Sequence, residues 1–70
     1  MELNLLDVVT SNVTLPDFGV TAGMAGTIVE VYGDGEFEVE FCDDDGYTFA
    51  LLTMQAAQIT LTWKYTESAE

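Results

Sequence analysis

The amino-acid sequence predicts an all-β fold, and two observations support this prediction. Apolar and polar residues alternate along several short runs, which is the pattern of strands that bury one face. Glycine, proline, asparagine and aspartate separate these runs, and these residues favour turns between strands. The 49% hydrophobic content is that of a folding chain. We expect one domain over residues 1–66 and a flexible tail over residues 67–70, because 70 residues build only one small core.

The beginning of the chain predicts a strand followed by a long loop. Leucine and valine dominate residues 3–9, and a Thr-Ser-Asn sequence ends this run, so we expect the first strand there. The loop at residues 10–25 contains Pro16, Gly19 and Gly23 among serine, threonine and aspartate residues. We expect four apolar side chains to attach this loop to the core: Val13, Leu15, Phe18 and Val20.

Residues 26–41 predict a β-hairpin, because two alternating runs are joined by a Gly-Asp-Gly sequence. A two-residue turn would place charged and apolar side chains together on both faces of the hairpin. A three-residue turn, with Gly35 in the left-handed conformation, separates them. We therefore predict the three-residue turn.

This register fixes the neighbours across the hairpin. It pairs Val31 with Phe37 and Val29 with Val39, and it sets Glu30 opposite Glu38. Like charges directly opposite one another destabilise a sheet by roughly 0.2 to 1 kcal/mol, so stability alone does not favour this arrangement. On the next strand the register predicts three buried side chains, Phe37, Val39 and Phe41, and three outward ones, Glu36, Glu38 and Glu40.

The sequence Asp-Asp-Asp-Gly at residues 43–46 predicts a turn into a fourth strand, with Gly46 supplying a positive φ. The fourth strand is apolar on both faces, which indicates either cover from two sides or an interface. One face carries Tyr47, Phe49 and Leu51, and the other carries Ala50, Leu52 and Met54. We expect Leu52 and Met54 to lack cover in so small a protein.

The end of the chain predicts a 3₁₀ turn at residues 55–58 and then a last strand. In this strand Ile59, Leu61 and Trp63 alternate with threonines, which favours a position for Trp63 in the core or at one end of a barrel over a position facing a partner. Five short strands, a long first loop and a helical turn before the last strand are the order of an SH3-like barrel. We therefore predict a small five-stranded SH3-like barrel.

The charge of the sequence excludes several classes of partner. It contains 13 acidic residues, a single basic residue, Lys64, and no histidine, for a formal net charge of -12. Such a protein repels phosphate backbones and anionic lipids, so we expect neither nucleic-acid nor membrane binding. The single Cys42 cannot form an internal disulfide, and no secretory leader or membrane span is recognisable. We expect a cytoplasmic protein.

No catalytic, cofactor or metal site emerges from the sequence. Serine, threonine and cysteine nucleophiles have no histidine to activate them. The three adjacent aspartates lack the alternating spacing and the final glutamate of a calcium loop. We expect a protein that is not an enzyme and that uses no cofactor.

Several segments together resemble a family of small bacterial proteins that is described only as a domain of unknown function. The segments are LLDVV, LPDFG, MAGTIVEVY, EVEF and ALLTM, in this order over roughly residues 3–63. The resemblance implies an SH3-like barrel and supplies no enzyme activity that could be transferred to this chain. The GTIVEVY segment also resembles the KOW element of ribosomal proteins, but the basic residues that would meet phosphate are missing here.

Two hypotheses for the function follow. The first is a binding module that holds or neutralises a basic or neutral protein, as an antitoxin or immunity protein does. Its expected contact residues are Glu30, Glu36, Glu38, Glu40, Asp43, Asp44 and Asp45. The second is a structural or accessory subunit that docks through the apolar strand over residues 50–54, or self-associates through Leu52 and Met54. In that case the acidic face only keeps the protein soluble.

Overall fold

A computed structural model describes residues 2–66 as one antiparallel sheet of five strands, and the predicted tail over residues 67–70 lies outside this range. The strands are β1 (Val8–Ser11), β2 (Ala25–Val31), β3 (Glu36–Cys42), β4 (Thr48–Gln55) and β5 (Ile59–Trp63). The 3₁₀ helices are η1 (Pro16–Phe18), in the long first loop, and η2 (Ala56–Gln58), before the last strand. The predicted fold class is confirmed.

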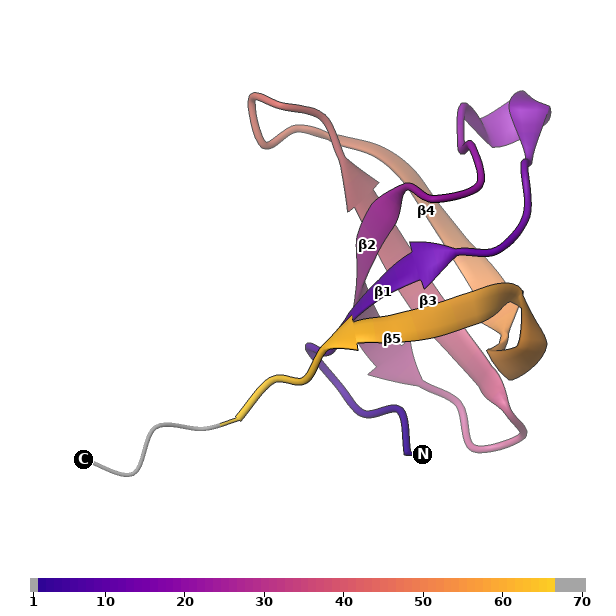
Figure 1. Ribbon diagram of the computed structural model, residues 1–70, viewed down its shortest axis with the longest axis vertical. Helices are drawn as coiled ribbons and strands as arrows, with labels where there is room; N and C mark the ends of the chain where they lie inside the picture. The colour runs from indigo at the N-terminus through magenta and orange to yellow at the C-terminus, as the bar shows by residue number, and fades with distance from the viewer. Residues whose placement is uncertain (1, 67–70) are drawn as a thin grey trace.

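The sheet curls around its core in the strand order β4-β3-β2-β1-β5, with β4 and β5 at its two edges (Figure 1). It is not closed, because β4 and β5 are each paired with one neighbour only. Apolar side chains of the inner face of the sheet, together with Val20 from the first loop, fill the space inside the curl. These buried residues are Val9, Val20, Ile28, Phe37, Val39, Phe41, Ala50, Met54 and Ile59.

The hairpin of β2 and β3 has the predicted three-residue turn. The N–H of Tyr32 donates to the oxygen of Glu36 at 3.0 Å, and Gly35 has the expected positive φ of 79°. Val31 lies opposite Phe37, and Glu30 lies opposite Glu38, as predicted.

The predicted pairing of Val29 with Val39 is wrong, because Val39 lies opposite Ile28 instead. A β-bulge between Ile28 and Glu30 inserts Val29 as an extra residue and shifts the register. The shift brings Ile28 into the core, where it is fully buried, and leaves Val29 half-buried.

The first strand begins at Val8, later than the predicted residues 3–9. Leu6 has a φ of 72°, and the N–H of Asp7 donates to the oxygen of Asn4 at 3.1 Å. These features form a turn, which cannot continue an extended strand. Leu5 and Leu6 are consequently 50% and 41% exposed.

The expected lack of cover for Leu52 and Met54 is also wrong. Met54 is 1% exposed and lies opposite Phe37, while Leu52 packs partly buried against the core opposite Val39. A strand that is apolar on both faces does not reveal which face is inside. The core takes Ala50, Leu52 and Met54, whereas Phe49 and Leu51 remain 42% and 55% exposed.

Trp63 does not lie in the core, which is one of its two predicted positions; it is the last residue of β5. It is 55% exposed and contacts the ring of Tyr65 edge to face, with ring centroids 6.2 Å apart. A register shift between Val8 and Val9 interrupts the pairing of β1 with β5. Beyond this shift, the alternation that buries Ile59 no longer directs Trp63 inward.

Candidate protein-binding face

Four glutamates share the outer face of the sheet, and we call Glu30, Glu36, Glu38 and Glu40 the acidic face. The last three alternate along β3 with the buried Phe37, Val39 and Phe41, so they point away from the core. They are half-buried among their neighbours, whereas Glu30 on β2 is exposed. The structure therefore brings together four of the seven residues that the sequence predicts for partner binding.

Two hydroxyl groups hold Glu38 in place, one from Tyr32, the residue after β2, and one from Thr53 on β4. The Oε1 of Glu38 accepts hydrogen bonds from the hydroxyl of Tyr32 at 3.2 Å and from the hydroxyl of Thr53 at 2.7 Å. Partial desolvation, the hydrogen bond to Glu38 and the charges of Glu38 and Glu30 all raise the pKa of Tyr32 above its usual 10.0. Tyr32 therefore remains a neutral hydrogen-bond donor at neutral pH.

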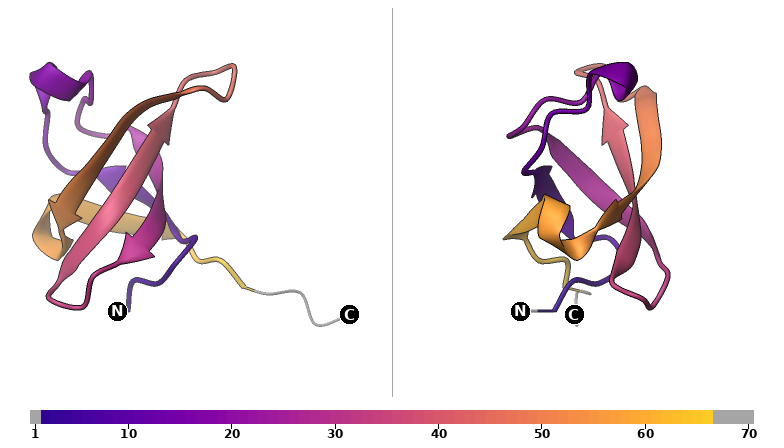
Figure 2. Two further views of the ribbon diagram at one scale, coloured as in Figure 1. Left: turned by 180° about the vertical axis from the view of Figure 1, so that it is seen from behind. Right: turned by 90° about the vertical axis from the view of Figure 1, so that its right-hand side faces the viewer.

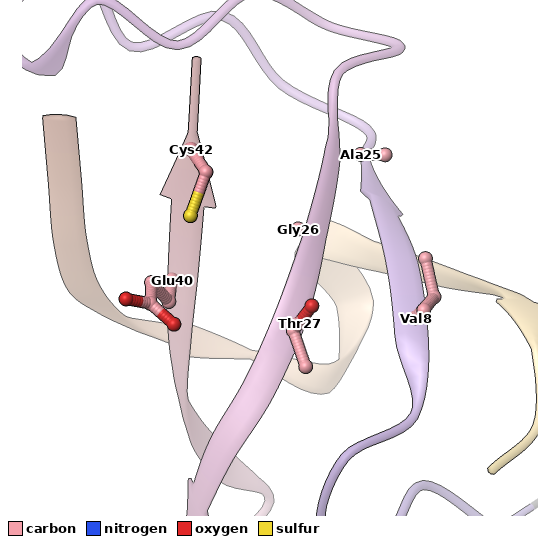
Figure 3. Close-up of a pocket in the computed structure, with 6 residues that line it drawn as sticks. All are labelled: Val8, Ala25, Gly26, Thr27, Glu40 and Cys42. Atoms are coloured by element: carbon pink, nitrogen blue, oxygen red, sulfur yellow. The ribbon is translucent and has the colours of Figure 1, made fainter. Parts of the chain in front are cut away.

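Glu40 lies beside a shallow pocket on the same outer face. Its Oε2 accepts a hydrogen bond from the hydroxyl of Thr48. The sulfur of Cys42 lies 3.8 Å from the same hydroxyl. Figure 3 shows side chains from three strands around the pocket, whose volume is about 130 Å³. It is lined by Val8, Ala25, Gly26, Thr27, Glu40 and Cys42.

The three remaining predicted contact residues, Asp43, Asp44 and Asp45, lie beyond the end of β3 in the turn to β4, as the sequence predicts. The Oδ1 of Asp43 accepts hydrogen bonds from the N–H groups of Asp45 and Tyr47, both at 2.9 Å. Gly46 supplies the expected positive φ of 87°. Asp43 therefore stabilises the turn, while Asp44 and Asp45 are exposed at its tip.

The only basic side chain of the sequence is bound to a buried carboxylate, which sequence reasoning missed. The Nζ of Lys64 lies 2.8 Å from the Oδ2 of Asp7, which is fully buried. The N–H of Asn4 donates to the same oxygen and the N–H of Tyr65 to Oδ1, both at 2.8 Å. Burial alone would raise the pKa of Asp7, but these donors, with Lys64 foremost, lower it below its usual 3.8.

The described residues offer little chemistry apart from this charge. Within residues 2–66, no group of three or more metal-ligating side chains is close enough to hold a metal ion. A second pocket of about 260 Å³ is lined by Leu3, Ala56, Ile59, Thr60 and Leu61, none of which titrates. No helix in this part of the chain is long and apolar enough to cross a membrane.

The family described as "Domain of unknown function (DUF4926)" matches residues 5–61. The chain belongs to this family. The resemblance to a domain of unknown function is thereby confirmed. The DUF4926 match contains β1 to β4, the acidic face and Asp7, and it ends within β5 before Lys64. No curated protein and no solved structure matches this DUF4926 chain.

Proposed function

We propose that the protein is a non-catalytic, acidic module that binds a basic protein partner. One observation carries this proposal: four glutamates share one face of the sheet, while the only cation of the sequence is bound to Asp7 elsewhere. The charge of the acidic face therefore has no basic side chain of its own to pair with. A cationic surface is the natural complement to such a face.

The kind of partner follows from what the charge does on encounter. A net charge of -12 accelerates association with a cationic protein and disfavours nucleic acid and anionic lipid. A basic toxin that acts on nucleic acid fits this description, so we propose an antitoxin-like or immunity-like role in bacteria. The free thiol of Cys42 is exposed, which suits the reducing cytoplasm.

A capture experiment with two triple variants tests this function. The first variant, Glu36→Gln, Glu38→Gln and Glu40→Gln, removes three charges from the acidic face. The control variant, Glu2→Gln, Asp17→Asn and Asp34→Asn, removes three charges elsewhere. We expect basic partners from native cells to be recovered by wild type and by the control, and to be lost with the first variant. Equal recovery by all three would remove the acidic face from the function.

A second candidate is an accessory subunit that docks through apolar surface. The support for it is the exposure of three large apolar side chains close together in sequence, Tyr47, Phe49 and Leu51. The docking residues would then be these three, because Met54 is buried. Changing Tyr47, the most exposed of the three, to serine should weaken partner recovery if this candidate holds, and should leave recovery intact if the acidic face binds.

A further inference from the structure

The β4 strand forms a free edge of the sheet. It is eight residues long and pairs with β3 alone, and Figure 2 shows it at the rim of the sheet. An edge strand presents a row of unpaired N–H and C=O groups, onto which another extended chain can pair. The question is which groups of β4 remain available.

Ladder geometry identifies two residues of β4 with outward-facing backbone. Because the oxygen of Glu36 accepts from Tyr32, the residue that follows β2, Glu36 faces β2, and the alternation of an antiparallel ladder turns Phe37 and Val39 toward β4. Their partners on β4 are Met54 and Leu52, respectively. Leu51, which precedes Leu52, and Thr53, which lies between Leu52 and Met54, therefore direct their N–H and C=O groups away from the sheet.

The neighbouring Gln55 supports this assignment. Its N–H, which the same alternation points outward, donates to the side-chain oxygen of Gln58 at 2.8 Å. The side chain of Gln58, the last residue of η2, thus occupies the outward N–H at the end of the β4 edge. No hydrogen bond among residues 2–66 covers the outward groups of Leu51 and Thr53 in the same way.

The side chains along this edge indicate the chemistry of an incoming strand. Leu51 is 55% exposed opposite Glu40, and the hydroxyl of Thr53 is bonded to Glu38. A strand added to β4 would lie about two strand spacings, or ~10 Å, from β3. Lysine or arginine side chains on its outer face would cross Leu51 with their aliphatic stems and approach Glu38 and Glu40 with their charged ends.

We propose that β4 accepts an extended, lysine- or arginine-bearing segment of the partner as a sixth strand, paired with the backbone of Leu51 and Thr53. This inference rests on the proposed function and specifies its binding mode. A second copy of the chain is a poor occupant, because β4-to-β4 pairing would join two molecules that each carry a formal charge of -12.

Two synthetic peptides test the pairing on the unmodified protein. Both alternate lysine and valine over the eight-residue length of β4, and one is N-methylated at alternate residues so that it cannot pair along one edge. We expect the unmodified peptide to bind in low salt and to protect the amides of Leu51 and Thr53 from hydrogen exchange. We expect the methylated peptide to bind at least about tenfold more weakly. Equal binding of both peptides, or of neither, would overturn the proposal.

Matched variants separate this proposal from the function on which it rests. Thr53→Pro removes the outward N–H, whereas Thr53→Val also loses the hydroxyl but keeps that N–H. Circular dichroism verifies that both variants fold. We then expect Thr53→Pro to bind the unmodified lysine–valine peptide about tenfold more weakly than Thr53→Val does. Full binding by Thr53→Pro, together with loss of binding in the Glu36, Glu38 and Glu40 triple variant, would keep the acidic face and reject edge pairing. Sedimentation showing that wild type dimerises and Thr53→Pro does not, without peptide binding, would assign the edge to a second copy and also reject the proposal.

Discussion

The ammonium group of Lys64 lies 2.8 Å from the buried carboxylate of Asp7, although the two residues are 57 positions apart in the sequence. This pair joins the turn before β1 to the residue that follows β5. Since Asn4 and Tyr65 donate their N–H groups to the same carboxylate, Asp7 is the centre of a four-residue clasp.

The clasp should contribute strongly to stability. We expect Asp7→Asn to lower the free energy of unfolding by about 2 to 3 kcal/mol, because a neutral amide loses charge-assisted hydrogen bonds and its NH₂ group faces donors. Urea denaturation measures this loss. Asp17→Asn is the control, since Asp17 is exposed in η1 and its substitution should change stability little. Equal stabilities of the two variants would contradict the assigned role of Asp7.

The same group predicts a dependence on pH. Because the pKa of Asp7 is lowered in the folded state, its stabilising contribution is complete above its unfolded value of about 3.8. The contribution is lost as the pH falls through the folded pKa. The difference in stability between wild type and Asp7→Asn should therefore be constant near neutral pH and shrink below pH 3.8. Thermal denaturation of both proteins from pH 7 to pH 2 checks this, and a difference that grows on acidification would argue against it.

Salt should stabilise the folded protein. Lys64 offsets only one of the 13 carboxylates. The remaining formal charge of -12 destabilises the folded state, because the carboxylates repel one another. Sodium chloride screens this repulsion, since the Debye length falls from about 30 Å at 0.01 M to about 3 Å at 1 M. We expect the melting temperature to rise with salt, and to rise less in the Glu36, Glu38 and Glu40 triple glutamine variant. Equal salt responses would locate the repulsion away from the acidic face.

The pair of Glu30 and Glu38 predicts which of the two glutamates can be replaced with a gain in stability. We expect Glu30→Gln to stabilise the protein by about 0.2 to 1 kcal/mol, because it removes a like charge opposite Glu38. Glu38→Gln removes the same repulsion but weakens the hydrogen bonds from Tyr32 and Thr53, so it should stabilise less or destabilise. Chemical denaturation of both variants compares them. A larger gain from Glu38→Gln would show that the hydroxyl contacts are unimportant.

Gly26 should tolerate no side chain. A Cβ atom there would lie 2.8 Å from Cγ1 of Val39, 2.9 Å from Cε1 of Phe41 and 3.0 Å from the oxygen of Glu40. We expect Gly26→Ala to destabilise the protein by about 1 to 3 kcal/mol through overpacking. The exposed neighbouring substitution Ala25→Ser is the control. In a double-mutant cycle, Val39→Ala should lower the free energy of unfolding less in the Gly26→Ala background than alone, because it removes the Cγ1 atom that the new methyl group would meet.

The hairpin could be predicted because local patterns determine it. Alternation identified the buried residues of β3, and the Gly-Asp-Gly sequence identified the turn. The bulge at Val29 was not visible, since it depends on how Ile28 fits the core. The buried face of β4 could not be chosen either, because both of its faces are apolar and only the packing of the other strands decides between them.

The acidic face was predictable from the alternation on β3, whereas its hydroxyl partners were not. Thr48 and Thr53 reach Glu40 and Glu38 only through the register of β3 with β4. The clasp was harder still, because no spacing rule connects residues 57 positions apart. One signal was present: a single cation among 13 carboxylates is a candidate for an internal role.

The pairing of β1 with β5 has a consequence for the order in which the protein folds. During synthesis, β2, β3 and β4 can form a meander as soon as they emerge, because each pairs with its neighbour in the chain. β1 is able to pair with β2 early, but its other edge has no partner until β5 has been made. Pairing β1 with β5 closes the long loop of chain between these two strands, and closing a long loop is slow compared with forming a hairpin. A nascent chain that stops before β5 exposes the edge of β1 and leaves Asp7 without the hydrogen bonds from Lys64 and Tyr65.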